Sequence, residues 1–249
     1  MKQLNYLLFL LVCLVTSIPS FAQFTINGRS VIYDKVSDTY MVSIPENAFG
    51  TDYEASIALD ATAGWSNLSI EGTDIADNYT FKQVEGNKIY KIHAQEGDKE
   101  INTQLTFTFL PLLVMEGTFG YSYAQGNISL LSPEAAEPTN SFAKVKWRGG
   151  TTNTADKHKR NYKIKTLNEK GKKQEISLLG MREDNNWILD AGQIDLFRLR
   201  NRIATEIWND FATKPYYASK EPKTKSGVTG KVVEVILNNE YRGIYSLTE

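Results

Sequence analysis

The stretch KVKWRGGTTNTADKHKRNYKIK, residues 144–165, alternates basic and apolar side chains on both sides of a polar interruption. The alternation predicts two strands joined by a loop, and the loop begins at Gly149-Gly150. Alternate residues from Lys159 to Lys165 share one face of the second strand, whereas Tyr162 and Ile164 point to the other. Adjacent glycines let a backbone approach an anion closely. The plainer alternative is that these lysines form a solvated strand face.

The sequence that follows changes from a period of two to a period of three or four. Apolar residues recur at Leu196, Leu199, Ile203, Ile207 and Phe211, which predicts an amphipathic helix of four to five turns with Asp195 as its N-cap. Alternation returns in residues 233–237, a turn follows at 238–239, and residues 241–245 form the second arm of a hairpin.

Short alternating runs separated by Gly, Asn and Asp predict a small antiparallel, sandwich-like β domain at residues 23–104. We place the boundary with a second domain, residues 105–249, near residue 104. The chain has two histidines that lie far apart in the sequence, and we interpret His93 as an exposed strand residue rather than a ligand, so we expect no metal site. The formal net charge of −1 argues against a dedicated nucleic-acid binder.

The N-terminus is typical of a secretory signal peptide. Lys2 precedes the apolar run 7–12, and small residues lead to Ala22, after which we expect cleavage. The run is short for a membrane span, so the mature chain is predicted to be secreted, periplasmic or on the cell surface, without an integral membrane segment; a membrane anchor is the alternative. The only cysteine, Cys13, lies inside this run, so the mature chain would contain no disulfide.

Five sequence motifs occur in a defined order in the second predicted domain. They are Trp147 to Gly150, Lys159 to Lys165, Leu179 to Leu189, Asp195 to Asn201, and Val233 to Glu249. Together they resemble the spore coat protein H-like (CotH) kinase family, and the resemblance covers roughly residues 105–249. It implies an α+β fold in which an antiparallel sheet and one main helix form the smaller lobe of an atypical protein kinase.

The resemblance implies a secreted or surface kinase that uses ATP and Mg²⁺ to phosphorylate a protein substrate. The basic stretch would then hold the nucleotide phosphates, with Lys163 as the first choice for the phosphate-binding lysine and Lys159 as the second. Arg148 would support this contact beside the two glycines. On the helix, Glu206 would form the ion pair with the lysine. Arg200 matches a characteristic helix residue of the family, with a structural or phosphate-facing role.

The sequence also departs from what the resemblance implies. It contains no G-x-G-x-x-G loop, and Leu247 to Glu249 would only begin the linker between lobes, where adenine could bind the backbone. In the family the catalytic and the metal-binding aspartates lie beyond this segment, so we assign no catalytic or metal residue here and interpret the chain as an inactive N-terminal fragment or a broken copy. A non-catalytic structural or adhesive surface protein is the alternative. Arg200 could also simply pair with Asp195 or Glu206.

Overall fold

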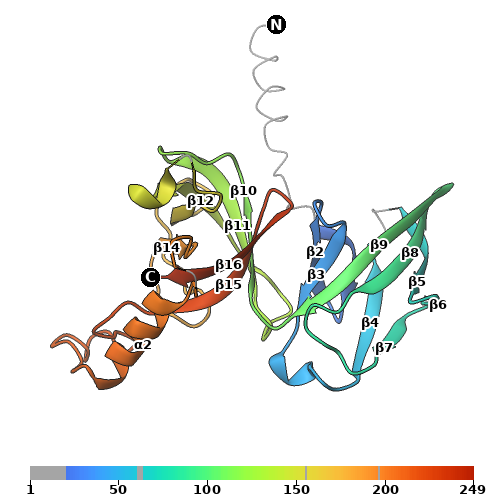
Figure 1. Ribbon diagram of the computed structural model, residues 1–249, viewed down its shortest axis with the longest axis horizontal. Helices are drawn as coiled ribbons and strands as arrows, with labels where there is room; N and C mark the ends of the chain where they lie inside the picture. Colours follow the sequence, from blue (N-terminus) through green and yellow to red (C-terminus); the bar gives the residue numbers. More distant parts are fainter. Residues whose placement is uncertain (1–20, 61–63, 155, 196) are drawn as a thin grey trace, which may run out of the picture.

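A computed structural model describes residues 21–60, 64–154, 156–195 and 197–249. Two β units lie side by side along the long axis of the molecule (Figure 1), and the helix α2 (Arg200–Phe211) lies at the far end of the second unit from the first. The predicted signal peptide lies outside the described residues except for its last two positions, which begin the first strand. No helix in the described ranges is long and apolar enough to cross a bilayer.

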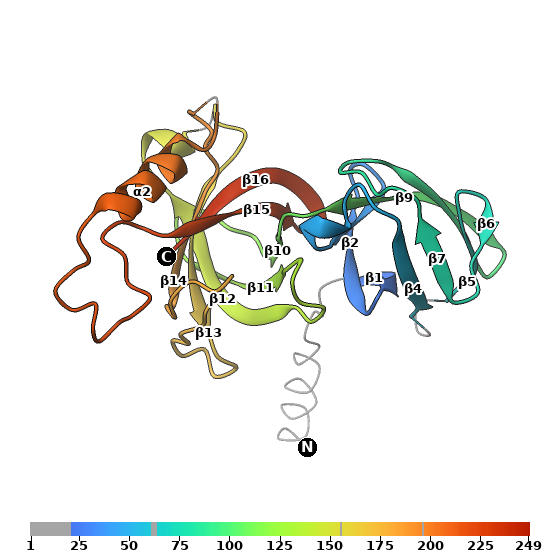
Figure 2. The ribbon, with the colours of Figure 1, turned by 90° about the horizontal axis from the view of Figure 1, so that it is seen from below.

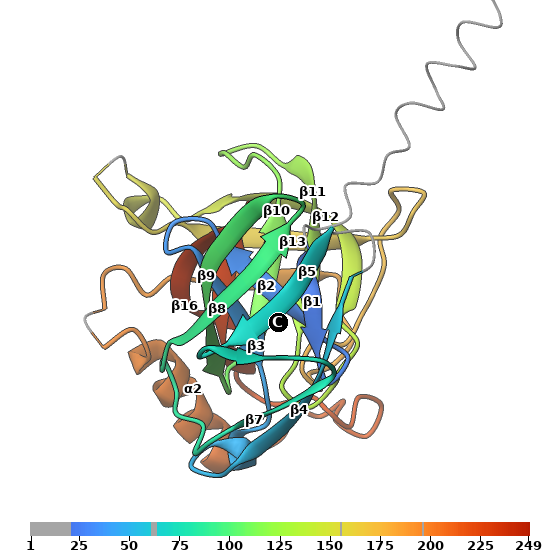
Figure 3. The same cartoon turned by 90° about the vertical axis from the view of Figure 1, so that its right-hand side faces the viewer.

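The first unit is a nine-stranded sheet whose strand order is β6-β5-β8-β9-β3-β2-β1-β4-β7. Its strands are β1 (Phe21–Ile26), β2 (Arg29–Asp34), β3 (Thr39–Ser43), β4 (Tyr53–Leu59), β5 (Trp65–Ile70), β6 (Thr73–Asp74), β7 (Asn78–Phe81), β8 (Tyr90–Glu96) and β9 (Lys99–Thr108). A 3-10 turn, η1 (Glu46–Ala48), follows β3. All pairs are antiparallel as predicted except β3 with β9, which run parallel. The strands curl around one aromatic-rich core that includes Phe24, Phe81 and Phe107 (Figure 3).

The second unit is a closed barrel in the order β10-β11-β12-β13-β14-β16-β15. Its strands are β10 (Leu112–Glu116), β11 (Ala124–Leu131), β12 (Thr139–Arg148), β13 (Asn161–Leu167), β14 (Asn186–Asp190), β15 (Gly230–Leu237) and β16 (Glu240–Thr248), with a 3-10 turn, η2 (Thr151–Asn153), after β12. Antiparallel pairing was the expectation, and a parallel pair, β10 with β15, closes the barrel. The β-rich architecture with one main helix is therefore confirmed, but the sheet closes on itself.

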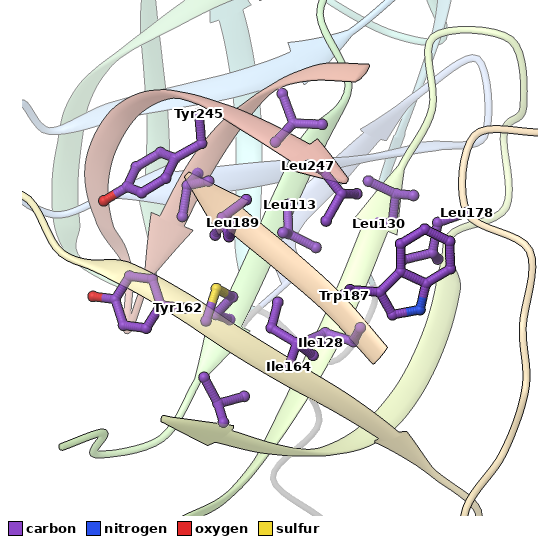
Figure 4. Close-up of a cluster of buried hydrophobic side chains, with 14 of the residues drawn as sticks. Leu113, Ile128, Leu130, Tyr162, Ile164, Leu178, Trp187, Leu189, Tyr245 and Leu247 are labelled. Carbon is purple, nitrogen blue, oxygen red and sulfur yellow. The ribbon is translucent and has the colours of Figure 1, made fainter. Parts of the chain in front are cut away.

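The barrel interior is filled by the apolar side chains that alternate along each strand. Figure 4 shows them converging from every side of the barrel, among them Leu113, Ile128, Leu130, Ile164, Trp187, Leu189 and Leu247. Because successive strand residues face opposite sides, the residues between them face outward. The alternation of 144–165 therefore divides into an inner apolar row and an outer basic row.

The two β units share a small buried interface. Ile32 and Met41 of the first sheet pack against side chains of the barrel, namely Leu112, Val114, Leu131 and Ile236. Beside them, the buried carboxylate of Asp34 accepts the backbone N–H of Tyr241 at 3.0 Å. The first sheet ends with β9 at Thr108 and the barrel begins with β10 at Leu112, so the change of sheet lies a few residues after the predicted boundary near 104.

The helix differs from its prediction in length and in the face that is buried. It begins at Arg200 rather than at 195 and has 12 residues. Arg202 is its only buried residue, whereas Ile203, Ile207 and Phe211 are exposed. The helix is held by a polar side chain because the Arg202 guanidinium donates from Nη2 to the carbonyl oxygen of Val228 at 2.7 Å. The predicted apolar face is not covered within the described residues.

Candidate functional site

A cavity of about 620 Å³ lies where β12 and β14 end and β13 begins, beside the first turn of α2. Four segments of the chain line it: residues 148–152, the first residue of β13, residues 190–195 without Ala191, and Arg200-Asn201. These segments belong to separate motifs of the sequence, and the barrel places them at one end. Figure 2 shows this end of the barrel, beside α2, away from the first sheet.

The loop after β12 has a shape that requires glycine at its first position. Gly149 has a φ of +101°, and a Cβ there would lie 2.0 Å from the hydroxyl oxygen of Thr152. The buried side chain of Asn153 fixes the loop from inside, because its Nδ2 donates to the carbonyl oxygen of Arg148. Its backbone N–H donates to the carbonyl oxygen of Gly150 at 3.2 Å. The loop is therefore held open toward the cavity with Arg148 exposed beside it.

Asn161 joins this loop to the end of β14. Its backbone N–H donates to Asn153 Oδ1 at 3.3 Å, and its own Oδ1 accepts the backbone N–H of Ala191 at 2.7 Å. Asn161 and Asn153 are both buried, so their amide groups have structural partners. From the sequence alone, Asn161 is expected on the basic face of its strand, and Asn153 has no expected role. In the sequence, Asn153 and Asn161 are recognisable only as two polar residues that flank the loop, and this pattern does not distinguish a buried amide from an exposed one.

Asp195 organises the start of α2. Its Oδ2 accepts the backbone N–H of Arg200 at 2.9 Å, and its Oδ1 accepts Arg200 Nε at 2.5 Å and the backbone N–H of Phe197 at 3.2 Å. The hydrogen bond from the Arg200 backbone is the main reason that the pKa of Asp195 is lowered. The N-cap of α2 is Leu199, so the prediction that Asp195 is the N-cap is wrong, although Asp195 accepts the backbone N–H of the first helical residue. The plainer role predicted for Arg200, an ion pair with Asp195, is confirmed, and Arg200 also lines the cavity.

Lys159 is held against β16. Its Nζ donates to the carbonyl oxygen of Ile244 at 2.7 Å and lies 4.2 Å from the ring centroid of Tyr245. Burial of the ammonium group, together with the nearby charge of Arg198, lowers the pKa of Lys159 to about 8. Arg198 in turn donates from Nη1 to the carbonyl oxygen of Ala191 at 3.2 Å, next to the cavity-lining loop. Lys159 therefore lies beside Arg198, which contacts the loop next to the cavity, but Lys159 is not among the residues that line the cavity.

Lys163 and Glu206 lie elsewhere. Lys163 projects from the outer face of the barrel, directly opposite Lys146 of β12, and does not line the cavity. Glu206 lines a different cavity, of about 390 Å³, and its Oε1 lies 3.1 Å from Arg202 Nε. The expected ion pair between Glu206 and a lysine is thus replaced by one with Arg202. Arg202 is buried, donates to the carbonyl oxygen of Val228 and lines the same second cavity as Glu206, which places its guanidinium beside that carboxylate.

The segment expected to begin a linker is part of the barrel. Leu247 is buried in the core, and Thr248 pairs with Ile188 on one side and Gly230 on the other, so their backbone groups are engaged in the sheet. Glu249 follows with its carboxylate near Arg182, where Oε2 lies 3.1 Å from Arg182 Nε. The adenine contact expected from Leu247 and Thr248 would compete with these strand pairs.

These observations describe a β-barrel whose motif residues meet around one polar cavity, which is lined by Arg148 and Arg200 and also by the carboxylates of Asp190 and Asp195. Residues 145–249 match a family model described as CotH kinase protein. The resemblance inferred from the five motifs is therefore confirmed over this segment, which begins later than the residue 105 expected. A comparison with curated proteins gave no match.

Proposed function

We propose that the chain carries the nucleotide-binding part of an exported CotH-type protein kinase. The observation that carries this proposal is the convergence of Gly149-Gly150, Arg148 and Arg200 on one cavity within the segment that matches the family. Glycine backbone and guanidinium groups are suited to bind phosphate oxygens. The polyphosphate of ATP would be held there, and a bound Mg²⁺ would neutralise charge that develops during transfer.

Of the two candidate lysines, Lys159 is better supported than Lys163. Lys159 lies close to Arg198 at the cavity end of the barrel, and its half-buried ammonium group makes stronger electrostatic contacts than a solvated one. Lys163 would need to reach the cavity from the outer face of β13. We therefore assign Lys159 and Arg148 to the phosphates, and Arg200 to a supporting position set by Asp195.

Phosphoryl transfer to a protein side chain is proposed as the activity of such a kinase, and residues 145–249 are proposed to supply its nucleotide-binding part. Export to the envelope or cell surface is proposed from the N-terminal sequence. Fractionation of cells that express the chain, followed by N-terminal sequencing of the exported form, tests the proposed export. A chain that stays in the cytoplasm with residues 1–22 still attached would contradict it.

Calorimetric titration of the chain with MgATP tests the binding site. We expect Arg148→Ala and Lys159→Met each to weaken binding by about tenfold, the size typical of a lost hydrogen bond to a charged group. Lys170→Ala, which removes an exposed lysine outside the cavity, is the matched control and should leave binding unchanged. A larger loss for Lys163→Ala than for Lys159→Met would reverse the lysine assignment. No heat of binding for the parent chain would favour the non-catalytic surface protein instead.

A further inference from the structure

Four lysines form a rectangle on the outer face of the barrel, which we call the lysine ladder: Lys144, Lys146, Lys163 and Lys165. Lys144 lies directly opposite Lys165, and Lys146 directly opposite Lys163. Directly opposed residues on neighbouring strands have Cβ atoms about 5 Å apart, and alternate residues along a strand repeat at about 6.8 Å. The ladder therefore presents two regular rungs of paired positive charge.

The ladder has no compensating negative charge from the described part of the chain. None of its ammonium groups makes an ion pair or a hydrogen bond with another described residue. Two of them lie over the ring of Tyr123, whose centroid lies 5.0 Å from Lys146 Nζ and 5.2 Å from Lys165 Nζ. Like charges directly opposite one another destabilise a sheet. Although the net charge of the chain is −1, four lysines therefore lie close enough on this face of the barrel to repel one another.

The four ladder lysines are partly exposed on the barrel surface, and their row leads to the candidate site. The apolar contact of the first sheet with the barrel is made with β10, β11 and β15, and its polar contacts include the start of β16 and the loop between β11 and β12. Figure 2 shows β12 and β13 on a part of the barrel away from the first sheet. Arg148 continues the outer row of β12 by one more alternate position and lines the cavity. A ligand lying along β12 would therefore pass from the ladder to the cavity.

We propose that the lysine ladder binds an extended acidic segment of a protein, and that this segment belongs to the substrate of the proposed kinase. Alternate side chains of an extended peptide repeat at the same spacing as the rungs, so carboxylates at every second position would each meet a rung. The net charge of the chain disfavours a nucleic acid as the ligand. The ladder also consists of lysines, which neutralise charge as points and lack the fork with which arginine recognises phosphate.

Fluorescence anisotropy with a labelled eight-residue peptide that has Asp at alternate positions tests this surface directly. The ladder variant is Lys144→Gln, Lys146→Gln and Lys165→Gln, which leaves Lys163 and Arg148 intact. The control variant, Lys91→Gln, Lys99→Gln and Lys170→Gln, removes the same charge from exposed lysines elsewhere. We expect the ladder variant to lose binding by about tenfold or more, and the control by less than about twofold. The same peptide with Asn in place of Asp should not bind.

Three results would overturn the proposal: equal losses in the two variants, binding of the Asn peptide, or tighter ladder-dependent binding of an oligothymidylate than of the acidic peptide. The urea midpoint of the ladder variant should equal or exceed that of the parent, because repulsion is removed, which excludes misfolding as the cause of a loss. The proposal rests on the proposed function only for the identity of the substrate. Peptide binding without MgATP binding would reject the kinase assignment alone, and MgATP binding without peptide binding would reject the ladder alone.

Discussion

The uncovered face of α2 makes a sharp prediction about stability. Leu189 and Ile207 are both large aliphatic residues in regular structure, but Leu189 is 0% exposed in the barrel core and Ile207 is 56% exposed. Leu189→Ala should cost about 2–5 kcal/mol, since it removes buried surface and leaves a cavity. Ile207 has less than half of its surface covered, so of the roughly 1.5–3 kcal/mol available from full burial it contributes about 1 kcal/mol. The higher helix propensity of alanine returns several tenths of that.

Urea titration followed by tryptophan fluorescence measures this contrast. With a slope of about 1–3 kcal/mol/M, Leu189→Ala should lower the midpoint by about 1 M or more, and Ile207→Ala by at most a few tenths of that. Trp187 is fully buried in the same core as Leu189 and reports on it. If Ile207→Ala lowered the midpoint as much as Leu189→Ala, the apolar face of α2 would be buried in solution and the placement of the helix would be refuted.

Three further predictions concern the candidate site. The pKa of Lys159 is lowered to about 8, so between about pH 8 and 10.5 the unfolded chain binds more protons than the folded chain. The cost of burying the charged ammonium group is fully present below pH 8, and the urea midpoint of the parent should therefore rise relative to that of Lys159→Met as pH rises through this window. A difference in midpoint that does not change with pH would contradict the burial of this group. Gly149→Ala should weaken MgATP binding and lower stability by about 1–3 kcal/mol because of its positive φ. Gly150→Ala, where a Cβ meets no protein atom within 4 Å, should leave stability unchanged. Asn161→Ala should cost about 1–3 kcal/mol in urea titrations, because the backbone N–H of Ala191 loses its acceptor; an unchanged midpoint would show that water replaces the amide.

Local patterns in the sequence predicted the strands and the terminal hairpin correctly. The hairpin forms as β15 and β16, and Asn238 and Asn239 both have positive φ, at 52° and 60°, as a tight turn between such strands requires. The closure of the barrel was not predictable in the same way. The barrel is closed by the parallel pair of β10 and β15, in which Leu112 lies opposite Glu234, far away in the chain. Parallel strands are not joined by a short hairpin turn, so no local sequence pattern indicates this pair.

The candidate site was predictable in its motifs but not in its partners. Arg148, Arg200 and the two glycines do converge, because strand ends and a helix start meet at the end of the barrel. The predicted ion pair between Glu206 and a lysine is wrong. The apolar periodicity of α2 shows that apolar and polar side chains lie on different faces of the helix, but not which face is buried. The buried face contains Arg202, and a buried arginine that donates to a backbone carbonyl takes the nearest carboxylate as its counter-ion.

The residues of the matching segment divide into two roles that mutagenesis can separate. The side chains of Asn153, Asn161 and Asp195 form hydrogen bonds with backbone atoms of the segments around the cavity, so these residues hold those segments in place. Arg148 has its guanidinium free of hydrogen bonds and ion pairs among the described residues, so it is available to a ligand. Replacing a positioning residue should therefore change stability and MgATP binding together, while replacing Arg148 should change binding alone. The lysine ladder belongs to neither role: its removal should leave the cavity intact, because its side chains support no loop and its charges oppose the folded state.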